Sequence, residues 1–515
     1  MLMTRKTLEA VTRDEVPRGA RVVHSTMQLK LKRLANNEVD KYKARCCARG
    51  DQLAGEIELT YSPTISALAY AVVHQLSIID DMKLCTIDTV GAYLYQDYPE
   101  DAEALFLKLE PAVAIACGLD PSQLYRVRKY LYGLPDAGRA YYRANSAHLK
   151  SNGYQQTISD PCLFMKRRDG ERTYVWIDVD DTFVASTSAS EINGIQELLR
   201  KEFEITVSDN VEQYLGVQME RLCDGSVKLT QPKLLAQIFE EYKPWEMSCR
   251  ATAPMYGREE EIPDTTPVER RKYQHLLGAL MYLLKSRPDI ATAISFAATH
   301  AVTPTVAAYE ELLYCVNYLY RTKEEGLILM QGTIGRELVL RCHVDASYLE
   351  HHDSRSHTGY CMSFGEVGSF YSKSCKQKLV TTSSTHAEMR AAFQLVQEIV
   401  FVVTLCEELC RPISLPVIVF EDNQPVIDLS GELNGKTKQC KHFLMLVNYI
   451  RERVEEGLVS FEKIASELNN SDILTKRVVG QDFRYKSQGI MGLKPGDLRI
   501  PPVASKRKRN CVEGV

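Results

Sequence analysis

Two short β-prone runs enclose an acidic tetrapeptide, and this pattern constrains the fold strongly. The runs cover residues 174–177 and 182–185, and Asp178-Val-Asp-Asp181 stands between them. The pattern predicts two strands joined by an acidic tip. Adjacent carboxylates beside buried strands repel each other and are costly without a cation. The segment therefore predicts either a cation site at the edge of a sheet or, as the plainer alternative, a surface turn that contains two Asp.

A third acid follows another predicted strand. Asp88 comes directly after the apolar run 84–87. Mg²⁺ prefers a few carboxylates together with substrate phosphates and water. Two such ions about 3.5–4 Å apart can hold an attacking 3′-oxygen and a leaving pyrophosphate. The first half of the chain therefore carries a candidate catalytic set, which consists of Asp88, Asp180 and Asp181.

The second half of the chain carries four acids on four separate predicted elements. Each of them alone is expected to be a helix cap or a surface acid. They can form one site only if the fold brings these distant segments together. The four are Asp345, Glu388, Asp422 and Asp472.

Length and composition indicate a multidomain protein. A chain of 515 residues is too long for one compact core. Its 45% hydrophobic and 25% charged residues are ordinary values for a globular protein. We place domain boundaries near residues 245 and 335. The expected order is a first region over 1–245, a second over 246–335, an α/β domain over 336–480 and a basic flexible tail over 481–515.

Hydrophobic periodicity predicts several further elements. Apolar residues recur at helical spacing over 192–203, where Ser190 can cap the start. A new apolar helix begins around residues 276–284, and Pro288 is expected to interrupt or end it. In the last third, the pattern predicts a strand over 338–340, a long helix over about 385–410 and a strand over 417–420.

Charge and cysteine content restrict the partners and the compartment. The net charge is −4, yet residues 1–50 carry 12 Lys and Arg against 5 Asp and Glu. Such a region can attract a phosphate backbone, or it can be a solvated polar face. The 15 cysteines show no zinc-site spacing and indicate reduced thiols. The longest apolar run, 399–403, is too short for a membrane span. We expect a cytoplasmic protein, and the basic run 506–509 leaves the nucleus open.

From about residue 13 to 480, a series of segments resembles the Pol polyprotein of copia-type (Pseudoviridae-like) LTR retrotransposons. Each segment alone is a weak signal, but they occur in the family's order and at fitting spacing. They are similar to the family's YKARLVARG, LDVKNAFL, SLYGLKQAPRAWY, ADPSLF, YVDD, FLGI, GSLMYL and RPDI segments, and they lie at 41–50, 87–94, 131–142, 159–164, 179–181, 214–216, 278–283 and 287–290.

This resemblance implies an α+β and α/β multidomain protein. Its first part, residues 1–245, would be a right-hand polymerase with fingers, palm and a thumb-like end, and residues 246–335 would be a connection region. Asp88, Asp180 and Asp181 would be its metal-binding carboxylates. Tyr93 matches a position that crowds the sugar 2′ carbon and so favours deoxynucleotides, although it could equally be an aromatic packed in the palm. The nucleotide-binding candidates for the triphosphate are the basic residues Lys43, Arg45 and Arg49.

The second acidic set resembles the RNase H domain of the same family. The segments SSTEAEYMAA, CDNQ and ADILTK are similar to residues 383–392, 421–424 and 471–476. The resemblance implies that a connection segment precedes an RNase H-like α/β domain, in which the four acids hold Mg²⁺, or Mn²⁺, as two ions in each active site. The implied reaction is hydrolysis of the RNA strand in an RNA–DNA hybrid. His442 matches a family histidine, for which packing and proton relay are both open.

Four positions depart from the family pattern. Asp178 replaces the Tyr that precedes Val-Asp-Asp, and it adds a negative charge beside the metals and the primer phosphates. Asp136 replaces a Gln and would repel a triphosphate in the expected nucleotide pocket. His386 replaces the first Glu of the STEAE motif, and Leu444 replaces an acid in KHID. The seven carboxylates required for the two-metal chemistry are nevertheless present.

The leading interpretation is a reverse transcriptase, an RNA-directed DNA polymerase with RNase H. Its expected partners are an RNA template, a DNA primer, an RNA–DNA hybrid and deoxynucleoside triphosphates, with no membrane. The alternative is a catalytically inactive, retrotransposon-derived remnant that at most binds nucleic acid. A host polymerase of the telomerase or group II intron type fits less well, because neither normally carries an RNase H-like domain at this position. Oligomeric state is left open, as is whether the chain is a fragment, a processed product or a domesticated gene.

Overall fold

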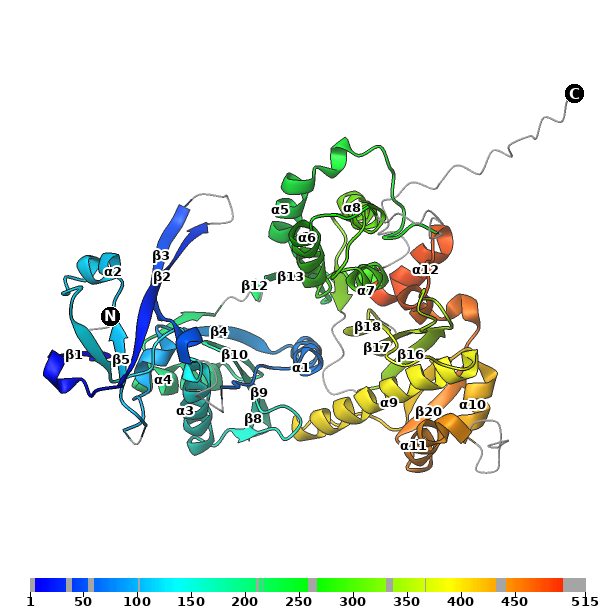
Figure 1. Cartoon of the computed structure of the whole chain (residues 1–515). Helices are drawn as coiled ribbons and strands as arrows, with labels where there is room; N and C mark the ends of the chain where they lie inside the picture. The colour runs from blue at the N-terminus through cyan, green and yellow to red at the C-terminus, as the bar shows by residue number, and fades with distance from the viewer. Residues whose placement is uncertain are drawn as a thin grey trace, which may run out of the picture. The chain divides into compact units, whose positions relative to one another are not determined.

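The computed structural model describes residues 5–33, 39–53, 60–100, 102–209, 213–214, 216–257, 266–329, 337–365, 367–431 and 441–493 (Figure 1). The chain divides into two compact units. Unit 1 comprises Met1–Val73 and Asp81–Val211, and unit 2 comprises His74–Asp80 and Glu212–Val515. The basic run at 506–509 lies outside the described residues. The domain boundaries expected near 245 and 335 remain predictions.

Unit 1 contains two sheets, and the first of them, sheet 1, has the strand order β1-β6-β5-β2-β3. The long antiparallel pair β2 and β3 carries many of the basic residues of the N-terminal region. Leu107 and Tyr125 are buried in its core together with Val113 of helix α2. The elements are β1 (Leu8–Val11), β2 (Arg21–Arg33), β3 (Val39–Ala48), β5 (Leu105–Lys108), β6 (Leu124–Val127) and α2 (Pro111–Ala116).

Sheet 2 of unit 1 has the order β11-β4-β10-β9-β8-β7 and contains the acidic hairpin. Tyr141 of α3 and Leu199 of α4 are buried in its core, while Trp176 and Phe183 stack at 3.8 Å on neighbouring strands. The elements are β4 (Lys83–Thr89), β7 (Gln155–Gln156), β8 (Leu163–Arg168), β9 (Glu171–Asp178), β10 (Asp181–Ser186), β11 (Ile205–Ser208), α1 (Ala67–Ile79), α3 (Ala137–Ser151) and α4 (Ala189–Glu202).

The hairpin and the following helix occur where the sequence predicts them, with one correction. The predicted strand runs lie inside β9 and β10, and the predicted helical face lies on α4. The cap prediction is wrong, because Ser190 lies inside α4 and Ser188 occupies the N-cap position. The Ser188 and Ser190 hydroxyls instead share a hydrogen bond of 2.8 Å.

The first part of unit 2 combines a small sheet, sheet 3, with a group of helices. Sheet 3 has the order β12-β13-β14-β15. Helix α6 ends before Pro288, as the sequence predicts, and a short 3-10 turn leads into α7. The elements are β12 (Gln213–Tyr214), β13 (Val217–Arg221), β14 (Val227–Thr230), β15 (Leu327–Leu329), α5 (Pro232–Tyr242), α6 (Arg270–Leu283), α7 (Ala291–Thr299) and α8 (Val306–Arg321).

A buried ion pair connects the turn after α6 to the C-terminal end of α8. Arg287 and Asp289 are each 1% exposed and lie 2.7 Å apart. The Arg287 guanidinium also donates to the Thr322 carbonyl at 3.1 Å, and the Tyr318 hydroxyl donates to Asp289 at 2.6 Å. Removing one partner of such a buried pair would leave an uncompensated charge, which costs about 3–5 kcal/mol. The Arg-Pro-Asp-Ile segment is therefore a structural link.

The second part of unit 2 is a sheet covered by a long helix. Sheet 4 has the order β18-β17-β16-β19-β20, with β16, β19 and β20 parallel to one another and β17 and β18 added antiparallel. The elements are β16 (Leu340–Ser347), β17 (His357–Phe364), β18 (Tyr371–Lys376), β19 (Val417–Glu421), β20 (Val459–Lys463), α9 (Ser384–Glu408), α10 (Gln424–Gly431), α11 (Leu444–Glu455) and α12 (Gly480–Met491).

Three sequence predictions can be compared with these elements. The long helix expected over 385–410 is α9. Its length and composition would suit a membrane span, but 56% of its apolar 18-residue window is buried inside the protein. The strand expected from 338 begins at Leu340, because Leu338 forms only an isolated bridge with Ile413. The flexible tail expected from 481 is wrong for its first residues, because Phe483 and Ile490 bury one face of α12.

Two candidate metal centres

The first acidic set lies at one end of the strands of sheet 2, at and beside the turn between β9 and β10. Val179 and Asp180 form the turn of the β9–β10 hairpin, and Val179 has a φ of 60°. A β-branched residue in this left-handed region is strained by about 1–2 kcal/mol. Backbone strain of this kind is often found at functional sites. The tight turn fixes the direction in which Asp180 and Asp181 leave the sheet.

The strand register aligns three acids across the sheet. Asp181 pairs with Asp88 on β4 and, on its other side, with Asp178 on β9. Residues directly opposite each other share a face of the sheet, and like charges there are destabilising. Asp88 and Asp181 are exposed at this end of the strands. Among the described residues, however, the carboxylate oxygens of the first set do not converge within 4.8 Å as a group.

An arginine and two tyrosines line the space next to Asp180. The rings of Tyr93 and Tyr132 lie 4.7 Å apart, and the Arg45 guanidinium lies 5.0 Å from the Tyr132 ring centre. The pKa of Tyr132 is raised to about 12, mainly by burial. The charge of Asp180 contributes to this rise, and Arg45 opposes it. Burial and Asp180 also raise the pKa of the half-buried Tyr93. One phosphate-binding candidate, Arg45, thus lies close to Tyr132, and the charges of Arg45 and Asp180 both act on Tyr132 and Tyr93.

The other two basic candidates are placed differently. Arg49 forms an exposed ion pair with Asp51 at 2.7 Å. Lys43 lies two residues before Arg45 on β3, opposite Lys30 of β2. Because side chains alternate along a strand, Lys43 and Arg45 share one face. Of the three candidates, Arg45 is the one whose charge, like that of Asp180, shifts the pKa of Tyr93 and Tyr132.

Asp136 lies beside a different pair of tyrosines, Tyr98 and Tyr130. Its carboxylate accepts a hydrogen bond of 2.9 Å from the Tyr130 hydroxyl, and the Tyr130 ring packs against Tyr98 at 5.4 Å. Burial raises the pKa of Tyr98, and the charge of Asp136 raises it further. The sequence placed Asp136 in the nucleotide pocket, whereas the structure gives its carboxylate a protein partner.

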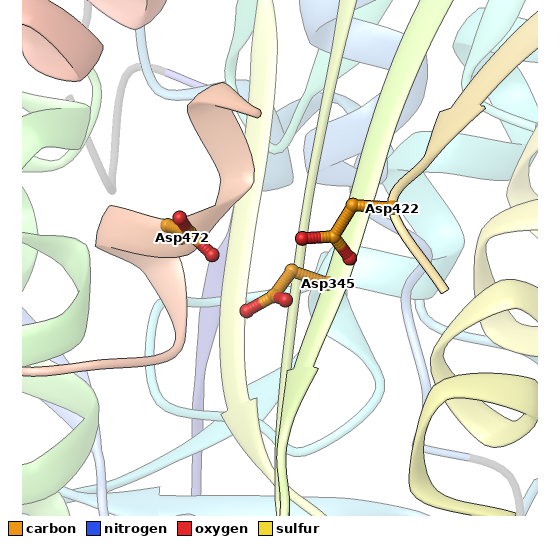
Figure 2. A group of neighbouring side chains, drawn as sticks. All are labelled: Asp345, Asp422 and Asp472. Atoms are coloured by element: carbon orange, nitrogen blue, oxygen red, sulfur yellow. The ribbon is translucent and has the colours of Figure 1, made fainter. Parts of the chain in front are cut away.

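The second acidic set lies at the end of sheet 4. In the parallel pair β16 and β19, His343 is in register with Phe420, so Asp345 lies level with Asp422 two residues later. Asp345 is still inside β16, opposite Gly359 of β17, whereas Asp422 directly follows β19. Asp472 approaches from the 3-10 turn at 470–474 (Figure 2). Oxygens of these three acids lie within 4.8 Å of one another. A second group with the same spacing consists of Glu388, Glu421 and Asp422.

Burial sets the electrostatics of this cluster. Asp345 is 1% exposed and Glu388 6%. The pKa of Asp345 is raised to about 6, mainly by burial. Lys476 and the Thr475 hydroxyl oppose this rise, and the charge of Asp472 adds to it. Burial raises the pKa of Glu388 well above its usual value, and the neighbouring acids add to this shift. Like charges held out of water in this way favour a bound cation.

Two lysines neutralise one side of the cluster. The Lys476 ammonium lies 3.1 Å from Asp345 and 2.8 Å from Asp472. The Lys486 ammonium contacts the other oxygen of Asp472 and donates to the Ser466 carbonyl at 2.8 Å. These contacts fix Asp472 and leave the side that contains Glu388 without such a partner among the described contacts.

The histidines near the cluster contact each other and a threonine. The rings of His386 and His442 lie 5.1 Å apart, and Thr382 Oγ1 is 2.6 Å from His442 Nε2. Burial lowers the pKa of His386 to about 4, so its ring is neutral at physiological pH. His442 therefore has a hydrogen-bonding contact as well as a packing one.

Sequence reasoning missed Glu421. It is 0% exposed and belongs to the metal-sized group with Glu388 and Asp422. The signal was the alternation along β19, where Val417, Val419 and Glu421 point to the buried face. An acid at a core position of a strand is expensive and indicates a site. All donors of the cluster are hard carboxylate oxygens, which fit Mg²⁺ or Mn²⁺.

Comparison with known proteins finds one family model and several similar proteins. Residues 8–255 match the model of the family described as reverse transcriptase (RNA-dependent DNA polymerase). The chain is 27% identical over 484 residues to the retrovirus-related Pol polyprotein from transposon TNT 1-94 of Nicotiana tabacum, with 91% of this chain and 35% of that protein covered. It is 26% identical over 481 residues to the Pol polyprotein from transposon RE2 of Arabidopsis thaliana, with 90% and 32% covered.

A yeast relative and a solved structure extend the comparison. The Ty1-ER2 Gag-Pol polyprotein of Saccharomyces cerevisiae is 24% identical over 470 residues, covering 86% of this chain and 26% of that protein. The chain thus spans about a third or less of these relatives. The foamy viral protease-reverse transcriptase dRH in complex with ds DNA has a TM-score of 0.47 at 10% identity, covering 90% of this chain and 68% of that one, a likeness too low to argue from.

Proposed function

We propose that the chain is an RNA-directed DNA polymerase with RNase H activity, because residues 8–255 match the reverse transcriptase family model and most of the chain is similar to copia-type retrotransposon Pol polyproteins. The observation that carries the proposal is the convergence of acids from distant segments in sheet 4, in a chain whose residues 8–255 match the reverse transcriptase family model. The partners would be an RNA template, a DNA primer, an RNA–DNA hybrid and deoxynucleoside triphosphates. We place the protein in the cytoplasm, with the nucleus as the alternative.

In the polymerase centre, Asp88, Asp180 and Asp181 would hold two Mg²⁺ ions. Such ions, when bound, activate the primer 3′-oxygen and neutralise the leaving pyrophosphate. Arg45 is suited to bind the triphosphate, since its guanidinium can contact phosphate in a bidentate manner. Tyr93, half-buried beside Asp180, would leave no room for a 2′-hydroxyl on the incoming nucleotide.

In the RNase H centre, the buried acids of sheet 4 would bind a second pair of ions. Asp345 lies inside β16, near its end, Asp422 follows β19, and Glu388 reaches the cluster from α9. Asp345 and Glu388 are nearly inaccessible to solvent. The scissile phosphate of the hybrid would therefore not contact these carboxylates directly but would bind the cations that they hold. The ions would supply the activated water, and the protein would fix their positions without a covalent nucleophile.

A catalytically inactive remnant is the second candidate, and one observation favours it. Asp178 pairs directly with Asp181, so a third negative charge shares the face on which primer phosphates would lie. Like charges on one face weaken phosphate binding. A remnant would bind nucleic acid at most and would extend no primer.

Primer extension separates the two candidates. Wild-type protein on poly(rA)–oligo(dT) with Mg²⁺ and deoxythymidine triphosphate should extend the primer, and Asp180→Asn should abolish extension. Asp209→Asn, a carboxylate outside the acidic tip, is the matched control and should retain it. If the wild-type protein and Asp180→Asn are equally inactive while both bind the template–primer, the remnant is favoured.

A further inference from the structure

The acidic cluster of sheet 4 contains more carboxylates than its four sequence-predicted members. We propose that Glu388, Glu421 and Asp422 together bind a divalent cation, with Glu421 as a direct ligand. This inference rests on the proposed function only for the purpose that the cation serves. The pocket itself is argued from burial and unsatisfied oxygens.

The first support is the geometry of the three acids. Their ligand oxygens all lie within 4.8 Å of one another. Mg²⁺ binds oxygen at about 2.0–2.1 Å, so two oxygens on opposite sides of the ion are about 4.2 Å apart. A small inward movement of the side chains would therefore complete the ligand set. Glu388 comes from a helix, whereas Glu421 and Asp422 come from the end of one strand.

The second support is that two buried oxygens of this group have no hydrogen-bond partner among the described residues. Glu421 is 0% exposed, and its Oε2 accepts no hydrogen bond from the part of the chain that the structure describes. The Oε2 atom of Glu388, which is 6% exposed, is likewise unsatisfied. An unsatisfied buried oxygen costs about 1–3 kcal/mol, and more when it is charged. A cation between the two acids would satisfy both oxygens at once.

The third support is how the Glu421 carboxylate is held. Its other oxygen, Oε1, accepts a hydrogen bond of 2.9 Å from the Asn423 backbone amide. This contact fixes the orientation of the carboxylate, because Asn423 lies in the short turn that joins β19 to α10. Fixing one oxygen from outside is the usual way in which a protein orients a metal ligand.

The distribution of positive charge favours a cation at this place. The lysine contacts described for the cluster go to Asp345 and Asp472, which Lys476 bridges. The oxygens of Glu388 and Glu421 belong to the other group. On the side of Asp345 and Asp472 a cation would therefore compete with the lysines, whereas on the side of Glu388 and Glu421 it would not. Such a division predicts two cation positions that respond to different substitutions.

Metal titration of the full chain tests this without nucleic acid or activity. Isothermal titration calorimetry with MgCl₂, and separately MnCl₂, is performed on metal-free wild type and on Glu421→Gln. We expect Glu421→Gln to weaken one class of binding by at least about tenfold. Glu462→Gln, an exposed acid on the neighbouring strand β20, is the matched control and should bind as wild type does.

Two further variants make the result decisive. Glu421→Asp keeps the charge but shortens the side chain, so it should fold and yet show weakened binding, which covers a failure of Glu421→Gln to fold. Asp345→Asn should weaken the other class of binding. Binding of both metals by folded Glu421→Gln or Glu421→Asp at wild-type affinity would overturn the inference.

The outcome is distinguishable from the fate of the proposed function. If the wild type binds two classes of ion in a Glu421-dependent manner but cleaves no hybrid, the pocket stands and the RNase H proposal fails. If it cleaves hybrid while metal binding is indifferent to Glu421, the function stands and the pocket fails. In that case Glu388 and Glu421 would share a proton in place of a cation.

Discussion

The two acidic centres differ in how far the fold has assembled them. In sheet 2, Asp88 and Asp181 are exposed and lie opposite each other, and in the described part of the chain they form with Asp180 no group of three whose oxygens lie within 4.8 Å of one another. In sheet 4, Asp345 and Glu388 are buried in a cluster with metal-sized spacing. The second centre is therefore preorganised by the protein, whereas substrate and ions would have to complete the first.

The largest expected effect is that one substitution removes hybrid cleavage while primer extension remains. Asp345→Asn should lower cleavage of the RNA strand in an RNA–DNA hybrid by at least about a hundredfold, because it removes a ligand from the preorganised centre. Primer extension by the same preparation should change less than twofold. Gel analysis of a labelled hybrid and of a labelled primer measures both. Parallel loss of the two activities would mean that the centres are not independent.

The next effect concerns the nucleotide that completes the first centre. Arg45→Ala should raise the KM for deoxynucleoside triphosphate by about tenfold, the effect of losing a phosphate contact worth about 1.4 kcal/mol. Arg49→Ala should change the KM much less, because Arg49 is paired with Asp51. Steady-state kinetics with varied nucleotide gives both values. An equal effect of the two substitutions would argue against Arg45 as the main phosphate ligand.

A similar size of effect is expected for sugar selection. Tyr93→Ala should improve ribonucleotide incorporation relative to deoxynucleotide by about tenfold, since the ring no longer crowds the 2′ position. Tyr95→Ala, in the same short turn but packed on Phe203 at 5.1 Å, is the control. Competition between the two nucleotide types on one primer measures the ratio. Unchanged discrimination would leave Tyr93 as a packing residue.

Stability should depend on pH through the buried centre. The pKa of Asp345 is raised to about 6 and that of Glu421 to about 8. Because both folded-state values lie above the unfolded ones, the folded protein retains protons that the unfolded chain has released. The destabilisation is absent near pH 4 and grows as pH rises to about 8.

Thermal unfolding in metal-free buffer checks this sign. The Tm should fall by several degrees between pH 5 and pH 8, and Asp345→Asn should reduce the fall. Saturating Mg²⁺ at pH 8 should restore stability, by about 2.7 kcal/mol at a hundred times its Kd. A Tm that rises over this pH range equally in wild type and variant would contradict the assignment of buried, cation-seeking acids.

The smallest effect concerns the third acid of sheet 2. Asp178→Asn should raise primer extension about twofold to threefold, because it removes a charge opposite Asp181 while keeping the size of the side chain. The comparison is made at low and high salt, since screening should reduce the gain. A loss of activity would instead mean that Asp178 takes part in binding the ions.

The sequence predicted what depends on local pattern and failed where distant contacts decide. Alternating β-prone runs located β9 and β10, and helical periodicity located α4 and α9. The α12 helix was missed because its stability comes from packing of Phe483 and Ile490 on a distant core. Such packing has no local signal.

The site shows the same limit. The candidate acids could be named from segments that resemble a family, and the register then placed Asp88 opposite Asp181. Which carboxylates actually converge depends on three-dimensional contacts, and only the structure revealed Glu421 in the cluster and Lys476 between two of the acids. The partner of Asp136, the Tyr130 hydroxyl, was likewise not predictable from spacing.

Anomalous scattering from a crystal soaked in Mn²⁺ would show most directly whether the fold alone assembles one of the two centres. The account predicts strong peaks among Asp345, Glu388 and Asp422 in the protein without substrate, and peaks at Asp88 and Asp181 only when nucleotide and template–primer are bound. Manganese absent from the sheet 4 acids, or bound first at the exposed hairpin, would contradict it.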